Sequence, residues 1–194
     1  MRARTMAALG VGALMTMGST VTGQTPALAL RILVLNHAGA PPSVVAAAEQ
    51  RAGRVFKAAG VNLTCVDRAT LGNDPRPVDY TVMILSREQT AALARDSALG
   101  PDNVMGFAPV NDSADHGHIA YAFYHRIDDL ASRAAVPVAN VLGQVMAHEL
   151  GHLLLGLHGH SDEGIMRSGW TLTRALTGRF TPRQAEQIRQ YLMR

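Results

Sequence analysis

The chain has 194 residues, of which 47% are hydrophobic and 17% are charged, with 18 Lys and Arg against 15 Asp and Glu. No run of basic residues accompanies this small positive charge, so the sequence gives no indication of a nucleic-acid partner. Cys65 is the one cysteine, which excludes an internal disulfide.

The first 29 residues are predicted to be a signal peptide. Arg2 and Arg4 give the start of this segment a positive charge, and an apolar run follows at 6–17. The segment ends in an A-x-A cleavage site at Ala27-Leu28-Ala29, with 21–23 as an earlier alternative. The apolar run is too short to span a bilayer. We therefore predict a protein that is secreted or periplasmic and has no stable membrane association.

Residues 30–194 are predicted to fold as a single domain in which strands and helices alternate. The strands are expected at 31–35, 61–66, 80–85, 104–109 and 118–123. The helices are expected at 44–59, 86–94, 127–133, 137–155 and from 182 onward, with Ser43 and Thr181 as N-caps and 67–79 as a loop. A strand, a helix and a strand in succession indicate a βαβ start and a mixed sheet, which places the fold in the α/β (α+β) class.

The helix expected at 137–155 carries the sequence His148-Glu149-Leu150-Gly151-His152. Residues four apart lie on one face of a helix, so the two imidazoles can bind one ion and form half of a tetrahedral zinc site. Glu149 lies one step around the helix, where its carboxylate can reach a water molecule at the open position of the metal and act as general base. An HExxH motif of this kind calls for a helix under both histidines and a further ligand downstream.

Gly156 is expected to end this helix, and two more histidines, His158 and His160, follow it. Either can complete a three-histidine site and leave the fourth position for water. Four of the eight histidines of the chain fall within residues 148–160. This density favours a metal site over a buried helix that carries two core histidines by chance.

The segment resembles the metzincin-type zinc metallopeptidases, whose active-site helix reads HExxHxxGxxH and precedes a tight turn that contains a methionine. It also resembles a group of small exported bacterial proteins with an ending like HELGHLLLG…HS…GIM. The resemblance implies that His148 and His152 bind zinc, that Glu149 is the general base and that Met166 is the turn methionine.

The third ligand depends on how the motif is aligned. The residue spacing of the metzincin motif puts the third histidine at His158. The His-Ser pair before Gly-Ile-Met indicates His160 instead. Leu155 stands where the metzincin pattern has glycine, and the glycine comes one residue later, at Gly156. Because an extra residue in the helix delays the turn, we predict His160 as the third zinc ligand and keep His158 as the alternative.

We therefore predict a monomeric, secreted zinc metalloendopeptidase that hydrolyses peptide or protein substrates with Glu149 as general base. The resemblance implies a metzincin-like architecture with a mixed twisted sheet, an active-site helix, a small C-terminal helical subdomain and an antiparallel edge strand, at 104–108 or 118–123, beside the cleft. Two alternatives are kept: the same metal site can hydrolyse a non-peptide amide or ester, or the chain can be a non-catalytic exported zinc-binding module.

Overall fold

The computed structural model describes residues 28–169 and 177–194, apart from residues 75, 97–103 and 112–116. Residues 1–27 of the predicted signal peptide lie outside the described residues, so export and cleavage stay predictions. No helix in the described part of the chain combines the length and the apolar character that crossing a membrane requires.

A five-stranded sheet with the order β2-β1-β3-β5-β4 lies at the centre of the fold. The first four strands in this order run parallel, and β4 pairs antiparallel with β5 at the edge. The strands are β1 (Leu28–Asn36), β2 (Val61–Val66), β3 (Tyr80–Leu85), β4 (Gly106–Phe107) and β5 (Ile119–Phe123). The predicted mixed sheet with its βαβ start is thus confirmed, and the antiparallel edge strand is the one within 104–108.

β1 begins three residues earlier than the sequence predicted. Leu28 and Ala29 pair with Val61 and Asn62 at the start of β2. Signal-peptide cleavage after Ala29 would remove this pairing, whereas cleavage at the earlier alternative, 21–23, would leave β1 whole.

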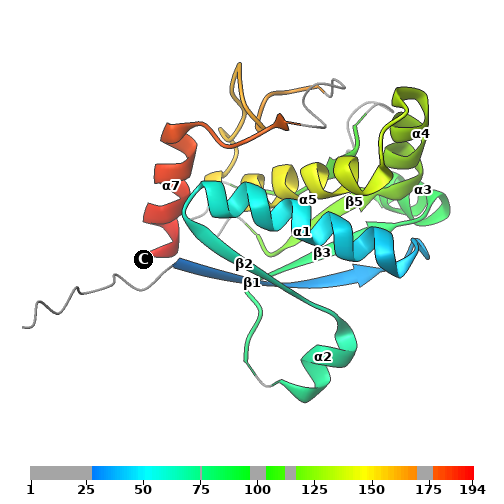
Figure 1. The fold of residues 1–194 in the computed structure, drawn as a ribbon, viewed down its shortest axis with the longest axis horizontal. Helices are drawn as coiled ribbons and strands as arrows, with labels where there is room; N and C mark the ends of the chain where they lie inside the picture. The colour runs from blue at the N-terminus through cyan, green and yellow to red at the C-terminus, as the bar shows by residue number, and fades with distance from the viewer. Residues whose placement is uncertain (1–27, 75, 97–103, 112–116, 170–176) are drawn as a thin grey trace, which may run out of the picture.

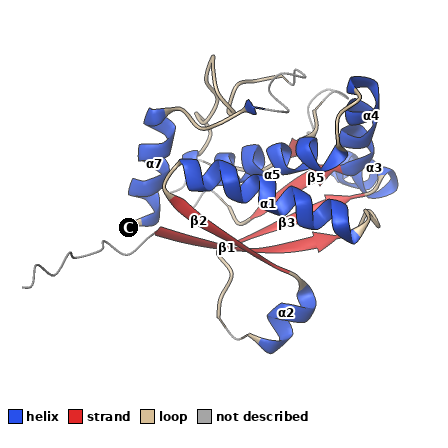
Figure 2. Cartoon of the chain, viewed as in Figure 1, coloured by secondary structure: helices blue, strands red, loops and turns tan. Residues whose placement is uncertain are grey.

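Two long helices, α1 (Pro42–Ala58) and α5 (Val138–Leu155), lie side by side on one face of the sheet (Figure 1). The short helix α2 (Arg68–Asn73) lies on the opposite side, below β1 and β2 in Figure 2. The other helices are α3 (Arg87–Asp96), α4 (Tyr124–Ala134) and α7 (Pro182–Leu192), of which α4 and α7 pack against α5. α7 is the small C-terminal helical part that the sequence predicted.

Two local predictions are wrong. The expected loop 67–79 contains α2, whose first turn is capped because the Asp67 carboxylate accepts a hydrogen bond of 2.7 Å from the Thr70 N–H. Ser43 is not an N-cap, because α1 begins at Pro42, two residues before the predicted start, and proline at this first position presets the helical φ. Thr181 caps α7 as predicted.

α5 is buried on all sides along most of its length. Residues 141–151 are all buried, and Gly156, with a φ of 73°, ends the helix as predicted. Polar groups are tolerated in such a position only if they are hydrogen-bonded or face an opening. His148 and Glu149, which are 6% and 4% exposed, are therefore the first indication of where the core opens.

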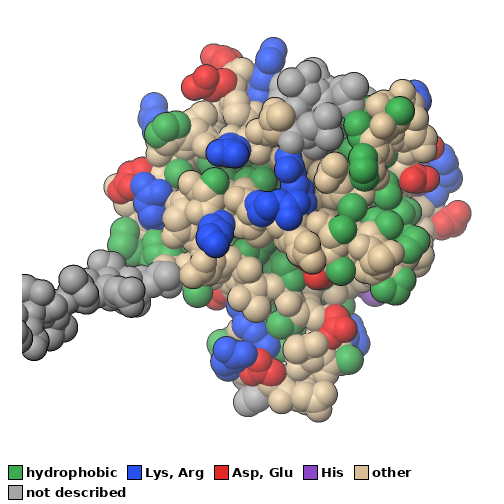
Figure 3. Space-filling view, in the orientation of Figure 1, with side chains coloured by type: hydrophobic (Ala, Val, Ile, Leu, Met, Phe, Trp, Pro, Cys, Tyr) green, Lys and Arg blue, Asp and Glu red, His purple; other side chains and the backbone are tan. Residues whose placement is uncertain are grey.

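Lys and Arg side chains gather on the face that carries α1 (Figure 3). Burial, and then the positive charges of Arg54 and Arg179, lowers the pKa of the Arg51 guanidinium. Arg179 is far from Arg51 and Arg54 in the sequence. Folding therefore creates a basic surface that cannot be seen as a run of basic residues in the sequence.

The close crossing of α1 and α5 depends on the absence of a side chain at Gly143. A Cβ added there would lie 2.5 Å from the Ala48 carbonyl oxygen and 2.6 Å from the Arg51 Cβ. We expect Gly143→Ala to lower the free energy of unfolding by about 1–3 kcal/mol in urea titrations, because the two helices must move apart.

Gly53→Ala, within α1, is the matched control, because nothing lies within 4 Å of a Cβ added there. It should raise the free energy of unfolding by about 0.5–1 kcal/mol, since alanine is the better helix former. Equal effects of the two substitutions would contradict a close crossing at Gly143.

Candidate metal centre and active site

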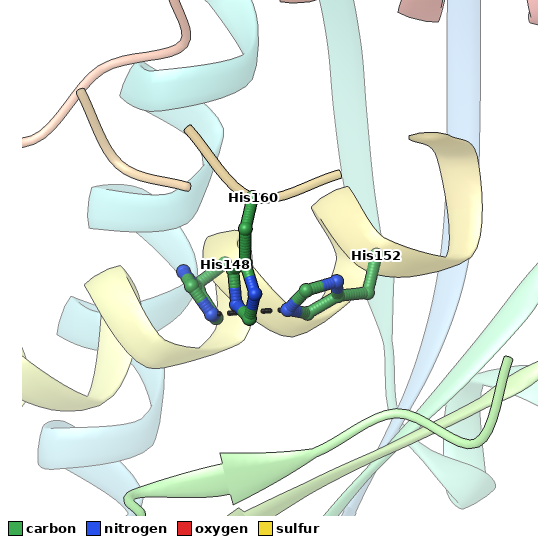
Figure 4. Close-up of side chains that lie close together, drawn as sticks. All are labelled: His148, His152 and His160. Carbon is green, nitrogen blue, oxygen red and sulfur yellow. Dashed lines mark hydrogen bonds between the residues drawn. The ribbon is translucent and has the colours of Figure 1, made fainter. Parts of the chain in front are cut away.

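Two histidine rings from successive turns of α5 present their nitrogens to each other. The Nε2 atoms of His148 and His152 are 3.2 Å apart, and the rings are nearly perpendicular, at 84° (Figure 4). Two zinc ligands at bond lengths of 2.0–2.1 Å in a tetrahedron are about 3.3 Å apart. The spacing of the two nitrogens therefore fits a shared cation.

His160 reaches the same place from the loop that follows α5 (Figure 4). Its ring centroid lies 4.6 Å from that of His152 and 5.7 Å from that of His148. The ligand atoms of all three lie within 4.8 Å of one another, and within the described residues this is the one such group of three or more His, Cys, Asp or Glu side chains. His158, the alternative from the sequence, is exposed and lies outside the group.

The protonation of these imidazoles suits a metal ion. His148 Nδ1 donates a hydrogen bond of 2.7 Å to the Ile165 carbonyl oxygen, which leaves the lone pair on Nε2. Burial, and then the neighbouring His148 and His160, lowers the pKa of His152 to about 3. Burial also lowers the pKa of His160. At neutral pH the rings of His152 and His160 are therefore uncharged, as metal-ligating histidines must be.

Glu149 projects from α5 toward β4. A Cβ added at Gly106 would lie 2.6 Å from Glu149 Oε1 and 2.6 Å from the Tyr121 carbonyl oxygen, so the glutamate fits only because β4 has a glycine there. Burial raises the pKa of this carboxyl group to about 8, because the charged form loses its hydration. A carboxyl group that titrates near neutral pH can both accept and return a proton.

One cavity of about 480 Å³ connects these groups. The three histidines and Glu149 line it together with β4. The rest of its wall is mainly apolar and includes Val104, Met105, Phe107, Ala108, Val110 and Leu157. Groups that can bind a metal and a group that can transfer a proton thus share a largely apolar cavity.

The turn after His160 packs against the same part of α5. Met166 is fully buried, and its sulfur would lie 2.5 Å from a Cβ added at Gly151. The Ile165 N–H donates to the Arg179 carbonyl oxygen at 2.8 Å, while the Ile165 carbonyl accepts from His148. Met166 therefore lies in the core against Gly151 of α5, and its assignment as the turn methionine stays a prediction.

A larger cavity, of about 630 Å³, lies at the carboxyl ends of β1 and β2 and includes Cys65, Glu49 and Asp67 in its wall. Burial, and then the negative charge of Glu49, raises the pKa of the Cys65 thiol to about 12. A thiol that stays protonated is a poor nucleophile. The larger volume of this cavity therefore does not make it the candidate site. The three histidines and Glu149 indicate the smaller cavity instead.

Two parts of the site were missed by sequence reasoning. Gly106 carried a signal, because a glycine inside a strand often marks a close backbone approach. The Ile165 carbonyl group gave no such signal, because every residue has a backbone carbonyl and the residue type does not show which one accepts a hydrogen bond.

Comparisons with protein-family models and with curated protein sequences find no match. Solved structures do match. The crystal structure of archaemetzincin from Methanopyrus kandleri is 18% identical in sequence and superposes with a TM-score of 0.55, over 85% of this chain and 96% of that chain. The crystal structure of a zinc-dependent peptidase from Methanocorpusculum labreanum is 14% identical, with a TM-score of 0.53 over 81% of this chain and 99% of that chain. The chain therefore has a metzincin-like fold, as its sequence predicted.

Proposed function

We propose that this protein is a zinc-dependent endopeptidase that hydrolyses peptide or protein substrates. The observation that carries the proposal is the convergence of His148, His152 and His160 in one cavity with the buried carboxyl group of Glu149. The fold shared with archaemetzincin supports it. Export and a monomeric state, both predicted from the sequence, belong to the same proposal.

The three histidines would hold zinc through uncharged ring nitrogens, with the His148 ring oriented by the Ile165 carbonyl group. When bound, zinc supplies Lewis-acid activation of water and of a carbonyl group, and its charge favours the ionised form of Glu149. Structural zinc sites use four protein ligands, whereas catalytic sites use three and keep one position open. Three histidines in an accessible cavity fit the catalytic class.

Glu149 would take the proton of the attacking water and deliver it to the amine that leaves. Its side chain is 4% exposed and is confined by the backbone at Gly106, so its carboxyl group is held beside the histidines. This mechanism requires no Ser or Cys nucleophile, which agrees with the protonated state of the Cys65 thiol in the other cavity.

β4 would bind an extended substrate by adding it to the sheet. β4 is the last strand in the sheet order, so its outer edge carries no other strand of the described sheet. A peptide paired with this edge would pass the histidines, because β4 and the histidines line one cavity. Pairing along an edge does not require a chain end, which favours endopeptidase action, and the apolar wall favours apolar side chains.

The first prediction concerns metal content. Purified protein should bind about one zinc ion per chain, and His160→Ala should lower the zinc affinity more than about 100-fold, because a direct ligand is lost. His158→Ala is the control and should bind zinc as the wild type does. Titration with a chelating indicator measures both. A wild type that binds no zinc, or loss of zinc with His158→Ala alone, would contradict the proposed ligand set.

The second prediction concerns the general base. Glu149→Gln should lower the rate of peptide hydrolysis by about 100- to 10,000-fold while the zinc content stays unchanged, because an amide cannot accept the proton. Glu163→Gln, at an exposed carboxylate in the loop after His160, should keep the wild-type rate. Assays on matched peptide, amide and ester substrates give the rates. Undiminished hydrolysis by Glu149→Gln would exclude this carboxylate as the base.

The third prediction concerns the zinc-free protein. The pKa of Glu149 is raised from 4.5 to about 8, so its contribution to stability is present below pH 4.5 and is lost as the pH rises to about 8. Glu149→Gln should therefore match the wild type in acid and exceed its free energy of unfolding by about 2 kcal/mol in alkali.

Chemical denaturation at both ends of this pH range provides the measurement. His152, whose pKa is lowered from 6.5 to about 3, acts in the opposite direction, because its contribution is lost as the pH falls below 6.5. Both proteins contain His152, so the difference between them isolates Glu149. A difference that does not change with pH would show that Glu149 titrates as it would in water.

A further inference from the structure

Gln184 connects the start of α7 to the loop that carries His160. The Gln184 side chain is buried. Its Nε2 donates a hydrogen bond of 3.3 Å to the Gly159 carbonyl oxygen and one of 2.8 Å to the Ser161 hydroxyl oxygen. Gly159 and Ser161 are the two neighbours of His160, so one amide group holds the chain on both sides of that histidine.

The helix cap determines the orientation of this amide. Gln184 Oε1 accepts the Thr181 N–H at 3.0 Å, while Thr181 Oγ1 accepts the Gln184 N–H at 3.2 Å, which together form a capping box. A flipped amide would turn its NH2 toward the Thr181 N–H and its oxygen toward the Gly159 carbonyl oxygen. Both contacts would be repulsive, so the NH2 group must face the loop.

His160 depends on its backbone for its position. His148 and His152 are fixed by α5, whereas His160 is exposed and lies outside any helix. Within the described residues no hydrogen bond holds the His160 ring, and its ring contacts are with His148 and His152. A ligand on an unordered loop would lower metal affinity, because binding would have to fix the backbone of that loop.

Two backbone hydrogen bonds also constrain this loop. The Gly159 N–H donates to the Gly156 carbonyl oxygen, and the Ser161 N–H donates to the Met166 carbonyl oxygen, both at 3.1 Å. Each of them acts on one side of His160. The Gln184 amide spans both sides, and it comes from a helix that lies against α5.

We propose that Gln184 is a positioning residue for the third metal ligand: by bridging Gly159 and Ser161 it holds His160 where the cluster with His148 and His152 is complete. This inference rests on the zinc site proposed above. It gives α7 a role in metal affinity in addition to its role in packing.

Gln184→Glu tests this role while the cap is kept. Glutamate at this position preserves the capping box, and its negative charge suits the start of a helix. It has no N–H to donate, so an oxygen would face the Gly159 carbonyl oxygen. We expect the zinc Kd, measured by competition with a chelating indicator, to rise about tenfold. Circular dichroism of the zinc-free protein checks folding, and Gln184→Ala serves as the second variant.

Thr181→Ala is the matched control for the stability of α7. It removes the other half of the capping box and should lower the urea concentration at the midpoint of unfolding. The Gln184 side chain keeps its contacts with the loop, so the zinc Kd should stay at the wild-type value. If Thr181→Ala weakened zinc binding as much as Gln184→Glu, loosening of α7 would explain both results and the proposal would be overturned.

The sharpest test uses a protein that already lacks the third ligand. If Gln184 acts through His160, Gln184→Glu should leave the zinc Kd of His160→Ala unchanged. The visible absorption of Co2+ bound to Gln184→Glu should also shift toward that of His160→Ala, since this spectrum reports coordination geometry.

An equal loss of affinity with and without His160 would overturn the proposal and leave the zinc site intact. A zinc Kd of Gln184→Glu equal to that of the wild type would also overturn the proposal and leave the zinc site intact. A wild type that binds no zinc would overturn the proposed function itself, and this inference with it.

Discussion

The burial of α5 is the constraint on which the rest of the structure depends. Residues 141–151 are all buried, and α1, β5, α4 and α7 enclose them. Polar side chains at His148 and Glu149 are compatible with this burial because a cavity opens beside them. The energetic cost is seen in the raised pKa of Glu149. The same dehydration strengthens the attraction between this carboxylate and a nearby cation, so the burial that disfavours the charged form of Glu149 also favours a cation beside it.

Features set by residues close in the sequence were predictable. The i, i+4 spacing of His148 and His152 requires only a helix, and the apolar run around them indicates one. The cap at Thr181 also follows from a local pattern, a threonine before a proline at the first helical position. The mixed sheet follows from the alternation of strands and helices, because a βαβ unit is assembled from neighbouring segments.

Features set by contacts between distant segments left weaker signals in the sequence, and His160 was predicted only from its spacing to Gly-Ile-Met. His158 and His160 have the same chemistry and lie in one loop, and the course of that loop is fixed by Gln184, which follows more than twenty residues later. The need for glycine at Gly106 arises from Glu149, on another element. The helix α2 was missed for a different reason: the Gly, Asn and Pro residues of 67–79 indicate turns, and the cap at Asp67 was recognised only in the structure.

The short connection between His152 and His160 has a thermodynamic consequence. Seven residues separate the two side chains, so an ion that joins them closes a small ring in the chain and removes little entropy from the unfolded ensemble. An ion at this site would therefore add little to the stability of the fold. It would not act as a long-range cross-link in place of the disulfides that a chain with one cysteine cannot form. Apolar packing around α5 holds the domain, unlike a zinc finger, which unfolds without its metal. Under the proposed function, uptake and loss of the ion would be local, reversible events in a folded protein, and the free-zinc concentration around it would set the fraction of active chains.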